Sequence, residues 1–363
     1  MGNNIAPETW LIQRRFTMFS QRMPALLVCG ICCLSSSSCS DRGVDLYGAG
    51  ATFPAPLYKR WFLEYYHQHP DVRVNYQAIG SGAGIRQFSA NLVSFGASDA
   101  AMSDKEIEKA MEENPNRKGI LLLPMTAGSI ALCYNLPGNI SELKLSREVY
   151  ADIFLGKITS WDDPAIAKLN PGLDLPELEI AVVRRADGSG TTFAFTNHLS
   201  AISPEWKEKV GVGKAVTWPV GIGGNGNAGV AAWIQQTPGS IGYLEYGYAE
   251  LIHLSMASLE NKAGRYVLPT LESGQAALAG VVMPDNLRVF LPDPAGADAY
   301  PLVTYTWLLC FKDYSDRPIE AAALRDVIRY CLTDGQKFSV ELGYIPLPAD
   351  VAQRVLKAVD EIQ

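Results

Sequence analysis

An alternation of strand, glycine turn and helix is clearest in the segment Ile180-Ala181-Val182-Val183-Arg184-Arg185-Ala186-Asp187-Gly188-Ser189-Gly190-Thr191-Thr192. Its first four residues are apolar and predict a strand, and a helix is predicted over 192–199. The turn between them would leave free backbone N–H groups at the start of that helix, with hydroxyl groups and a guanidinium beside them. These are the donors that bind a tetrahedral oxyanion.

Two further glycine-rich turns belong to the same pattern. They are Gly48-Ala49-Gly50-Ala51-Thr52-Phe53-Pro54, before a helix that contains Leu57, and Ile79-Gly80-Ser81-Gly82-Ala83-Gly84, between a strand at 72–76 and a helix at 85–92. The first lacks the third glycine of a dinucleotide fingerprint, because Phe53 occupies that place. Each turn taken alone also has a purely structural interpretation. Ligands of open α/β sheets bind at the carboxyl ends of strands, where such turns gather.

A fourth strand end, Ser94-Phe95-Gly96-Ala97-Ser98-Asp99, adds a carboxylate. An ionised Asp only accepts hydrogen bonds, so it repels a bound anion unless that anion carries a proton. Phosphate keeps at least one proton near neutral pH and sulfate keeps none, so such a site can discriminate by a factor on the order of 10⁴. The alternative is that Asp99 caps the segment before Met102, and the sequence favours neither.

Two other motifs are similar to sites of different chemistry. Asp187-Gly188-Ser189-Gly190 is similar to the nucleophile turn of a serine hydrolase, but His198 lies about two helical turns further on, facing outward or into packing. Ser189 without a positioned base is not activated. The glycine-rich run 221–229 has no Lys-Ser or Lys-Thr pair, which argues against a P-loop. We interpret it as a tight loop into a helix at Val230, outside the site.

Short strands alternating with helices indicate an α/β protein with mainly parallel sheets. Ser103-Asp104-Lys105-Glu106 is a capping box that predicts a helix extending to about Glu113. Further helices are predicted at 147–154, 165–169, 228–236, 318–333 and 351–359. Strands are predicted near 94–97, 130–134, 180–183, 241–244 and 303–311.

Composition limits the class of partner. The 363 residues, 48% of them hydrophobic, are enough for a large core and about two domains. The net charge of −7 argues against nucleic acid, so an anion must be captured by local donors. Beyond the first forty residues the cysteines are Cys133, Cys310 and Cys331, at spacings that suit no metal site. We expect buried free thiols, with a Cys310–Cys331 disulfide as the alternative.

Residues 1–38 have the composition of an export signal that is removed. Three arginines precede the apolar run 25–34, and small residues follow up to Cys39. The apolar run is too short to span a bilayer, so an anchoring helix is not favoured. The position of Cys39 is similar to a bacterial lipoprotein cleavage site, although Ser36 stands where such sites usually carry Leu. Lipidation of Cys39 and plain cleavage nearby remain alternatives.

In chain order, these segments resemble the phosphate-binding proteins of bacterial high-affinity phosphate ABC transporters. The matching stretches are Gly48-Ala49-Gly50-Ala51-Thr52-Phe53-Pro54-Ala55-Pro56, Ile79-Gly80-Ser81, Phe95-Gly96-Ala97-Ser98-Asp99, Leu155-Gly156-Lys157-Ile158, 161–172, 181–191, Ile241-Gly242-Tyr243-Leu244-Glu245-Tyr246 and Leu342-Gly343-Tyr344-Ile345-Pro346-Leu347-Pro348. Gly82-Ala83-Gly84 departs from a Ser-Gly-Gly-like run but keeps Ser81. The region 256–299 matches poorly, and we assign it no function.

The resemblance implies a type II periplasmic-binding-protein fold, with two α/β lobes joined by two crossover strands. Lobe I would comprise 44–126 and 303–363, lobe II would comprise 127–302, and the hinge would lie near 126–130 and 301–305. The residues implied to bind phosphate are Thr52, Phe53, Ser81, Asp99, Arg185, Ser189, Gly190 and Thr191. Asp99 would accept the ligand's proton, Arg185 would supply the charged contact, and Asp187 would orient Arg185.

The implied function is an extracytoplasmic receptor, not an enzyme, that binds inorganic phosphate between the lobes and delivers it to the membrane permease subunits of an ABC transporter. We expect a monomer in the periplasm or on the outer face of the cell membrane. Its only attachment to the membrane would be a lipid on Cys39, in the alternative in which that residue is lipidated. No cofactor, metal or nucleic acid is expected. The alternatives are a phosphatase-like enzyme of the same fold, a receptor for another oxyanion, and a phosphate sensor.

Overall fold

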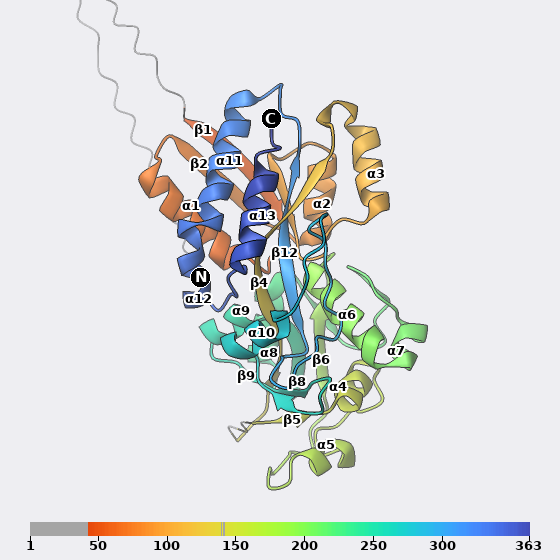
Figure 1. Ribbon diagram of the computed structural model, residues 1–363. Helices are drawn as coiled ribbons and strands as arrows, with labels where there is room; N and C mark the ends of the chain where they lie inside the picture. Colours follow the sequence, from red (N-terminus) through yellow and green to blue (C-terminus); the bar gives the residue numbers. More distant parts are fainter. Residues whose placement is uncertain (1–42, 139, 141) are drawn as a thin grey trace, which may run out of the picture. The chain divides into compact units, whose positions relative to one another are not determined.

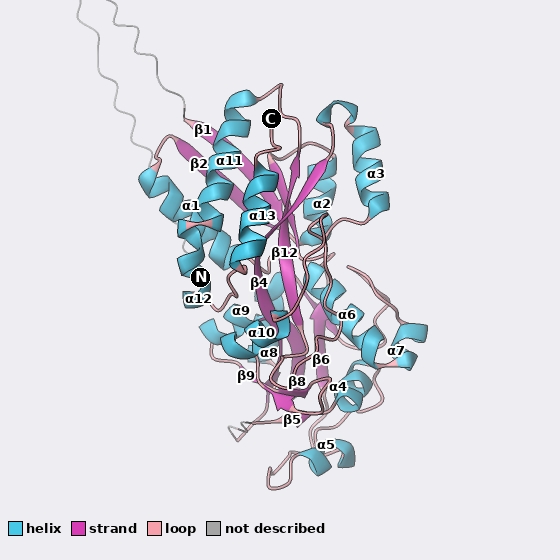
Figure 2. Ribbon diagram, viewed as in Figure 1, coloured by secondary structure: helices cyan, strands magenta, loops and turns pink. Residues whose placement is uncertain are grey.

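A mixed sheet of nine strands forms the centre of the molecule (Figures 1 and 2). This computed structural model describes residues 43–138, 140 and 142–363. The strands of the sheet are β1 (Val44–Gly50), β2 (Val72–Ala78), β3 (Phe95–Ser98), β4 (Ile120–Asn135), β6 (Ala181–Arg185), β7 (Ile222–Gly224), β8 (Ser240–Glu245), β9 (Ser255–Met256) and β12 (Val303–Phe311). Their order is β2-β1-β3-β12-β4-β8-β6-β7, with β9 beside β4. A small second sheet joins β5 (Lys144–Leu145), β10 (Ser258–Glu260) and β11 (Tyr266–Val267).

The long strand β4 is shared by two halves of the sheet. Residues 120–129 pair antiparallel with β12, and residues 130–135 pair antiparallel with β8. The register shifts between Thr306 and Trp307, whose partners are Thr126 and Pro124, so Met125 is an extra residue on β4. This bulge lies beside Pro124, which has no N–H group to give to the ladder. All of β4 except its two end residues is buried, which explains why its sequence is mainly apolar, with Thr126 and Ser129 as the polar residues of its interior.

Helices cover both halves. They are α1 (Ala55–Gln68), α2 (Ser81–Ser89), α3 (Asp104–Glu113), α4 (Arg147–Phe154), α5 (Pro164–Leu169), α6 (Gly190–Ile202), α7 (Pro204–Lys209), α8 (Gly226–Gln236), α9 (Tyr246–Leu251), α10 (Leu271–Leu278), α11 (Pro318–Leu332), α12 (Lys337–Glu341) and α13 (Ala349–Val359). Helices α1, α2 and α11 pack on β1, β2 and β3, whereas α6, α8 and α9 pack on the β8 half (Figure 1). Strands β1, β2 and β6 each lead into a helix.

Most elements predicted from the sequence are confirmed. The capping box of α3 is present, and α4 and β12 have the predicted bounds. The prediction of mainly parallel sheets was wrong for the centre, because β12 and β4 both run antiparallel to their neighbours. Helix α2 begins at Ser81 rather than 85, since Gly80 at φ +89° is its N-cap and the small residues after it form the first turn.

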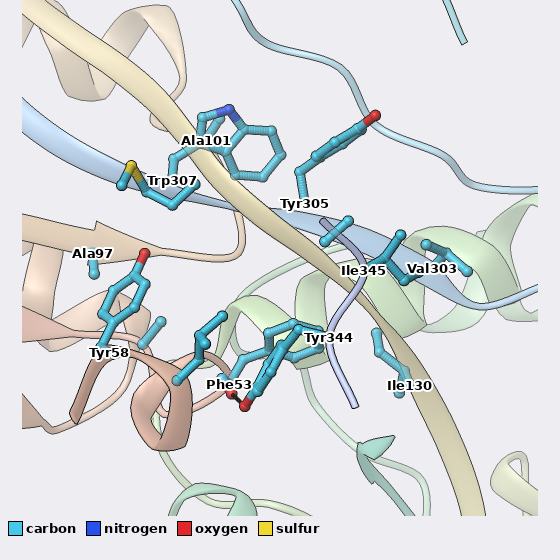
Figure 3. Close-up of a cluster of buried hydrophobic side chains, with 14 of the residues drawn as sticks. Phe53, Tyr58, Ala97, Ala101, Ile130, Val303, Tyr305, Trp307, Tyr344 and Ile345 are labelled. Atoms are coloured by element: carbon cyan, nitrogen blue, oxygen red, sulfur yellow. Dashed lines mark hydrogen bonds between the residues drawn. The ribbon is translucent and has the colours of Figure 1, made fainter. Parts of the chain in front are cut away.

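The core at the junction of β4 and β12 fixes the turn after β1. Phe53 and Tyr344 pack edge to face, with ring centroids 6.2 Å apart, and the Tyr344 hydroxyl donates to the Phe53 carbonyl at 2.7 Å (Figure 3). The adjoining Ile345 forms a bridge with Ala127 of β4. The C-terminal part of the chain therefore holds the Thr52–Phe53 backbone in place.

Other sequence predictions have mixed outcomes. Cys133, Cys310 and Cys331 are buried free thiols, as predicted, so the Cys310–Cys331 disulfide alternative was wrong. The export signal and Cys39 lie outside the described residues. The predicted lobe boundaries fall inside β4 and just before β12 and stay a prediction. Among the described residues, no helix has the length and apolarity needed to span a membrane.

Gly84 allows α2 to approach the ends of β1 and β3. A Cβ atom there would lie 2.7 Å from the Ala49 carbonyl oxygen and 2.9 Å from that of Ala97, and these backbone atoms cannot move aside. Helix propensity alone favours Ala by about 1 kcal/mol, but the overlap should dominate, so we expect Gly84→Ala to destabilise the protein by about 1–3 kcal/mol. Urea denaturation measures this change.

The matched control is Gly229→Ala in α8, where the nearest atom would lie 3.3 Å from the new Cβ. We expect the control to leave the free energy of unfolding unchanged or to raise it by up to about 1 kcal/mol, because helix propensity favours Ala and the overlap is small. Equal effects of the two substitutions would contradict the packing argument.

Candidate functional site

The structure brings the predicted site residues together at the ends of strands. Thr52 and Phe53 follow β1, Ser81 opens α2, and Asp99 follows β3 directly. Arg185 ends β6, Ser189 is the N-cap of α6, and the first two residues of α6 are Gly190 and Thr191. The side chains that donate or accept hydrogen bonds are almost fully buried, Thr52 at 7% exposure being the most accessible. A site with this little access to water must satisfy its polar groups internally or through a ligand.

Direct contacts join the two sides of this site. The Thr191 hydroxyl donates to Asp99 Oδ2 at 3.4 Å, and the Asp99 N–H donates to Ser81 Oγ at 3.3 Å. Gly190 packs so closely that a Cβ atom would lie 2.6 Å from Asp99 Cβ and 2.7 Å from Ser81 Oγ. Gly190 is therefore required by contact rather than by backbone conformation.

Five backbone N–H groups in the site have no acceptor within the described part of the chain. They belong to Thr52, Phe53, Ser81, Gly190 and Thr191. Ser81, Gly190 and Thr191 are the first residues of two helices, where N–H groups have no partner inside the helix and the helix dipole is positive. Buried N–H groups without partners are rare in proteins, so five in one place indicate a site built for an anion.

The Arg185 guanidinium is held by Asp187. Arg185 Nε donates to Asp187 Oδ1 at 2.7 Å and Nη2 donates to Oδ2 at 2.5 Å, and the Gly226 N–H donates to Oδ1 at 3.0 Å. Burial opposes ionisation of Asp187, but these hydrogen bonds and the positive charge of Arg185 outweigh it and lower its pKa. The remaining nitrogen, Nη1, points toward Thr191 Oγ1 at 3.4 Å. Asp187 thus orients Arg185 and leaves the Nη1 edge of the guanidinium for a ligand.

Asp99 is the acidic group of the site. Its Oδ1 accepts a hydrogen bond from the Thr306 hydroxyl at 2.9 Å and its Oδ2 accepts one from Thr191, so it does not cap the segment before Met102. Burial raises the pKa of Asp99 to about 7, although hydrogen bonds from Thr306 and the charge of Arg185 act in the opposite direction. Near neutral pH the carboxyl can therefore either accept or donate a proton.

Ser189 has a narrower role than the sequence indicates. Its N–H donates to the Lys214 carbonyl at 2.8 Å, and its hydroxyl oxygen accepts from the Thr192 N–H at 3.0 Å as the cap of α6. Only the hydroxyl hydrogen remains for a ligand. His198 is buried and bonds to Tyr150 and the Pro292 carbonyl, as expected for a packed residue. Burial lowers the pKa of His198 to about 4.

Sequence reasoning missed the contribution of the glycine-rich run 221–229, which extends into the first turn of α8. It was interpreted as lying outside the site, but the Asn227 N–H and Nδ2 donate to Thr52 Oγ1 at 3.2 and 2.9 Å. Gly226 contacts Asp187 as described above. The glycine spacing was visible in the sequence, whereas the contact joins residues 175 positions apart. Thr306 was missed for a similar reason, because within β12 it has the pattern of a core residue.

Comparison with known proteins places the chain in a class. A model of the PBP superfamily domain matches residues 37–334, so the chain belongs to this superfamily of periplasmic binding proteins. A solved phosphate-binding protein from Stenotrophomonas maltophilia has the same fold, with a TM-score of 0.70 and 19% identity, over 86% of this chain and 93% of that chain. The type II periplasmic-binding-protein fold predicted from the sequence is confirmed.

Two curated relatives define the family within that class. "Phosphate-binding protein PstS" from Pasteurella multocida is 42% identical over 324 residues, covering 88% of this chain and 91% of the relative. The protein of the same name from Methanocaldococcus jannaschii is 40% identical over 335 residues, covering 86% and 85%. The chain therefore belongs to the family of PstS phosphate-binding proteins, and the resemblance seen in the sequence is confirmed.

The raised pKa of Asp99 predicts how stability depends on pH. The folded pKa of about 7 exceeds the value of 3.8 for an unfolded chain, so the stabilising contribution is complete below about pH 4 and is lost as the pH rises through 7. Glu245, whose pKa burial raises to about 8, acts in the same direction. Asp99 alone should therefore lower the unfolding free energy of ligand-free protein by about 3 kcal/mol from pH 5 to pH 8, whereas His198, whose pKa burial lowers to about 4, acts in the opposite direction over this range.

The variant Asp99→Asn isolates this contribution, because it cannot ionise. Relative to the unchanged protein, it should gain stability as the pH rises from 5 to 8. Urea denaturation in phosphate-free buffer at both values measures the difference. A difference between the two proteins that does not vary with pH would contradict the assigned protonation of Asp99.

Proposed function

We propose that this protein is a receptor that binds one inorganic phosphate ion at Arg185 and delivers it to the permease subunits of an ABC transporter. The observation that carries the proposal is the set of five N–H groups around Arg185 and the buried Asp99 that have no acceptor among the residues that the structure describes. Membership of the PstS family supports phosphate as the ligand and transport as the context. We further propose that the receptor acts as a monomer.

The donors of the site suit an ion with more than one negative charge. The charge of Arg185 is already shared with Asp187, so the guanidinium cannot neutralise a dianion by itself. The remaining charge is spread over amide dipoles at helix starts, and each charge-assisted hydrogen bond contributes on the order of 1.5–3 kcal/mol. Because the site is buried, these contacts act in a medium of low dielectric constant, where each is stronger than in water.

Asp99 gives the site its preference for a protonated anion. An ionised carboxylate can accept the proton that phosphate carries, whereas sulfate would place two acceptors face to face. A buried pair of acceptors without a hydrogen costs more than the loss of a neutral hydrogen bond. On this basis Asp99 selects phosphate against sulfate.

A receptor fits the site better than a hydrolase. Ser189 Oγ is engaged in capping α6, and His198 bonds to Tyr150, so His198 is not positioned to activate the hydroxyl. Within the residues that the structure describes, no cluster of three or more His, Cys, Asp or Glu side chains could hold a metal ion. Purified protein should therefore not turn over a chromogenic phosphate ester.

The proposed location is the periplasm or the outer face of the cell membrane. It rests on the composition of residues 1–38 and on the family of the chain. Lipidation at Cys39 and plain cleavage remain the two alternatives for attachment. Mass spectrometry of the mature N-terminus distinguishes them.

Selectivity is the direct test of this proposal. Isothermal titration of the purified protein at pH 8 should show phosphate binding and a sulfate affinity weaker by a factor on the order of 10⁴. Asp99→Asn, which can donate a hydrogen bond, should bind sulfate more tightly than the unchanged protein does. Equal affinity of the unchanged protein for the two anions would remove Asp99 from its role.

The selectivity for phosphate over sulfate should also depend on pH. The pKa of Asp99 is about 7, so below this pH the carboxyl is mainly neutral. A neutral carboxyl can donate a hydrogen bond to an oxygen of sulfate. The ratio of phosphate to sulfate affinity should therefore fall as the pH is lowered from 8 to 6 in the unchanged protein. In Asp99→Asn this change should be much smaller, and a parallel fall in both proteins would contradict the prediction.

A further inference from the structure

The Thr52 hydroxyl receives two hydrogen bonds from one residue. Thr52 Oγ1 accepts from the Asn227 N–H at 3.2 Å and from Asn227 Nδ2 at 2.9 Å. A threonine hydroxyl has two acceptor positions and a single hydrogen. With both acceptor positions occupied, the hydrogen can only be donated, and Thr52 Oγ1 has no acceptor within the described part of the chain.

The orientation of the Asn227 side chain is fixed by a third hydrogen bond. Its Oδ1 accepts from the Glu245 N–H at 3.0 Å, and the residue is completely buried. Rotating the amide by 180° would set Nδ2 against the Glu245 N–H, donor against donor. Nδ2 is therefore the atom that faces Thr52.

The backbone around both residues is also held in place. The Thr52 carbonyl accepts from the Tyr248 hydroxyl at 2.7 Å. Gly226 has φ +66°, and a Cβ atom there would lie 3.1 Å from Thr52 Cγ2, so glycine gives α8 its close approach. The start of α8 contacts both Thr52 and, through the Gly226 N–H, Asp187.

We propose that Asn227 is a positioning residue that makes Thr52 an obligate hydrogen-bond donor to the bound anion. Asn227 does this without any contact to the ligand, by occupying the acceptor side of the hydroxyl. The inference rests on the proposed function and extends it to a residue outside the predicted site. An anion offers only acceptors on most of its surface, so a hydroxyl that cannot accept is matched to it before binding.

A double-mutant cycle tests this role. Asn227→Asp keeps the size of the side chain but presents a carboxylate oxygen to Thr52, so the hydroxyl hydrogen turns away from the ligand. We expect the phosphate dissociation constant to rise by about 10- to 100-fold, the equivalent of one charge-assisted hydrogen bond. The added negative charge also weakens binding, and the cycle with Thr52→Val separates the two effects.

In the T52V background no hydroxyl remains, so N227D should weaken phosphate binding only through its charge. The rise in dissociation constant should be at least several-fold smaller there than in the unchanged protein. Thr52→Ser is the matched control, because it keeps the hydroxyl and should restore the full effect of N227D. Equal factors in all three backgrounds would overturn the proposal, since a merely structural role of Asn227 does not depend on the hydroxyl.

The measurement is isothermal titration with inorganic phosphate, accompanied by thermal melting of each ligand-free variant. Should N227D fail to fold, Asn227→Ala is run through the same cycle, where additivity again overturns the proposal and a larger loss with the hydroxyl present supports it. Absence of phosphate binding by the unchanged protein would instead refute the proposed function. The two failures are therefore distinguishable.

Discussion

An anion withdrawn from water must be surrounded by hydrogen-bond donors, and this constraint organises the whole site. The chain meets it mainly with backbone N–H groups, which need no particular side chain but do need helix starts and tight turns. The turn after β1 and the starts of α2 and α6 supply them, and Gly190 and Gly84 provide the close packing that brings these segments together. Arg185 adds a single charge, whose direction is set by Asp187.

The acidic group Asp99 lies in a buried position that opposes its ionisation. Asp99 lies among donors on one side and under the Thr306 hydroxyl of β12 on the other, almost completely buried. Burial raises the pKa of Asp99 to about 7 despite these favourable contacts. Burying a carboxyl in this way costs stability, and under the proposed function the proton of the ligand explains why the group is there. In the role proposed above, Asn227 complements Asp99: it occupies the acceptor side of the Thr52 hydroxyl, so that this neutral group can only donate a hydrogen bond.

The sequence predicted those candidate site residues whose positions follow from local pattern. Strand–turn–helix signals located Thr52, Ser81 and Arg185, and a strand end located Asp99. It failed where partners are distant in sequence: Asn227 meets Thr52 only through the packing of α8, and Thr306 is indistinguishable from its core neighbours in β12. In the fold, most of the longer helices were predicted, whereas the short helices α7, α9 and α10 were not, although each has a side-chain cap. The first ten residues of β4 were not predicted either, because Pro124 argues against a central strand until the bulge at Met125 is seen.

A crystal structure of the protein grown with phosphate tests the central claim most directly. We expect one tetrahedral ion within about 3 Å of the N–H groups of Thr52, Phe53, Ser81, Gly190 and Thr191, with one of its oxygens about 2.5–2.7 Å from an Asp99 oxygen, as expected for a charged O–H···O bond. An ion bound elsewhere, or an Asp99 carboxyl turned away from it, would contradict the account.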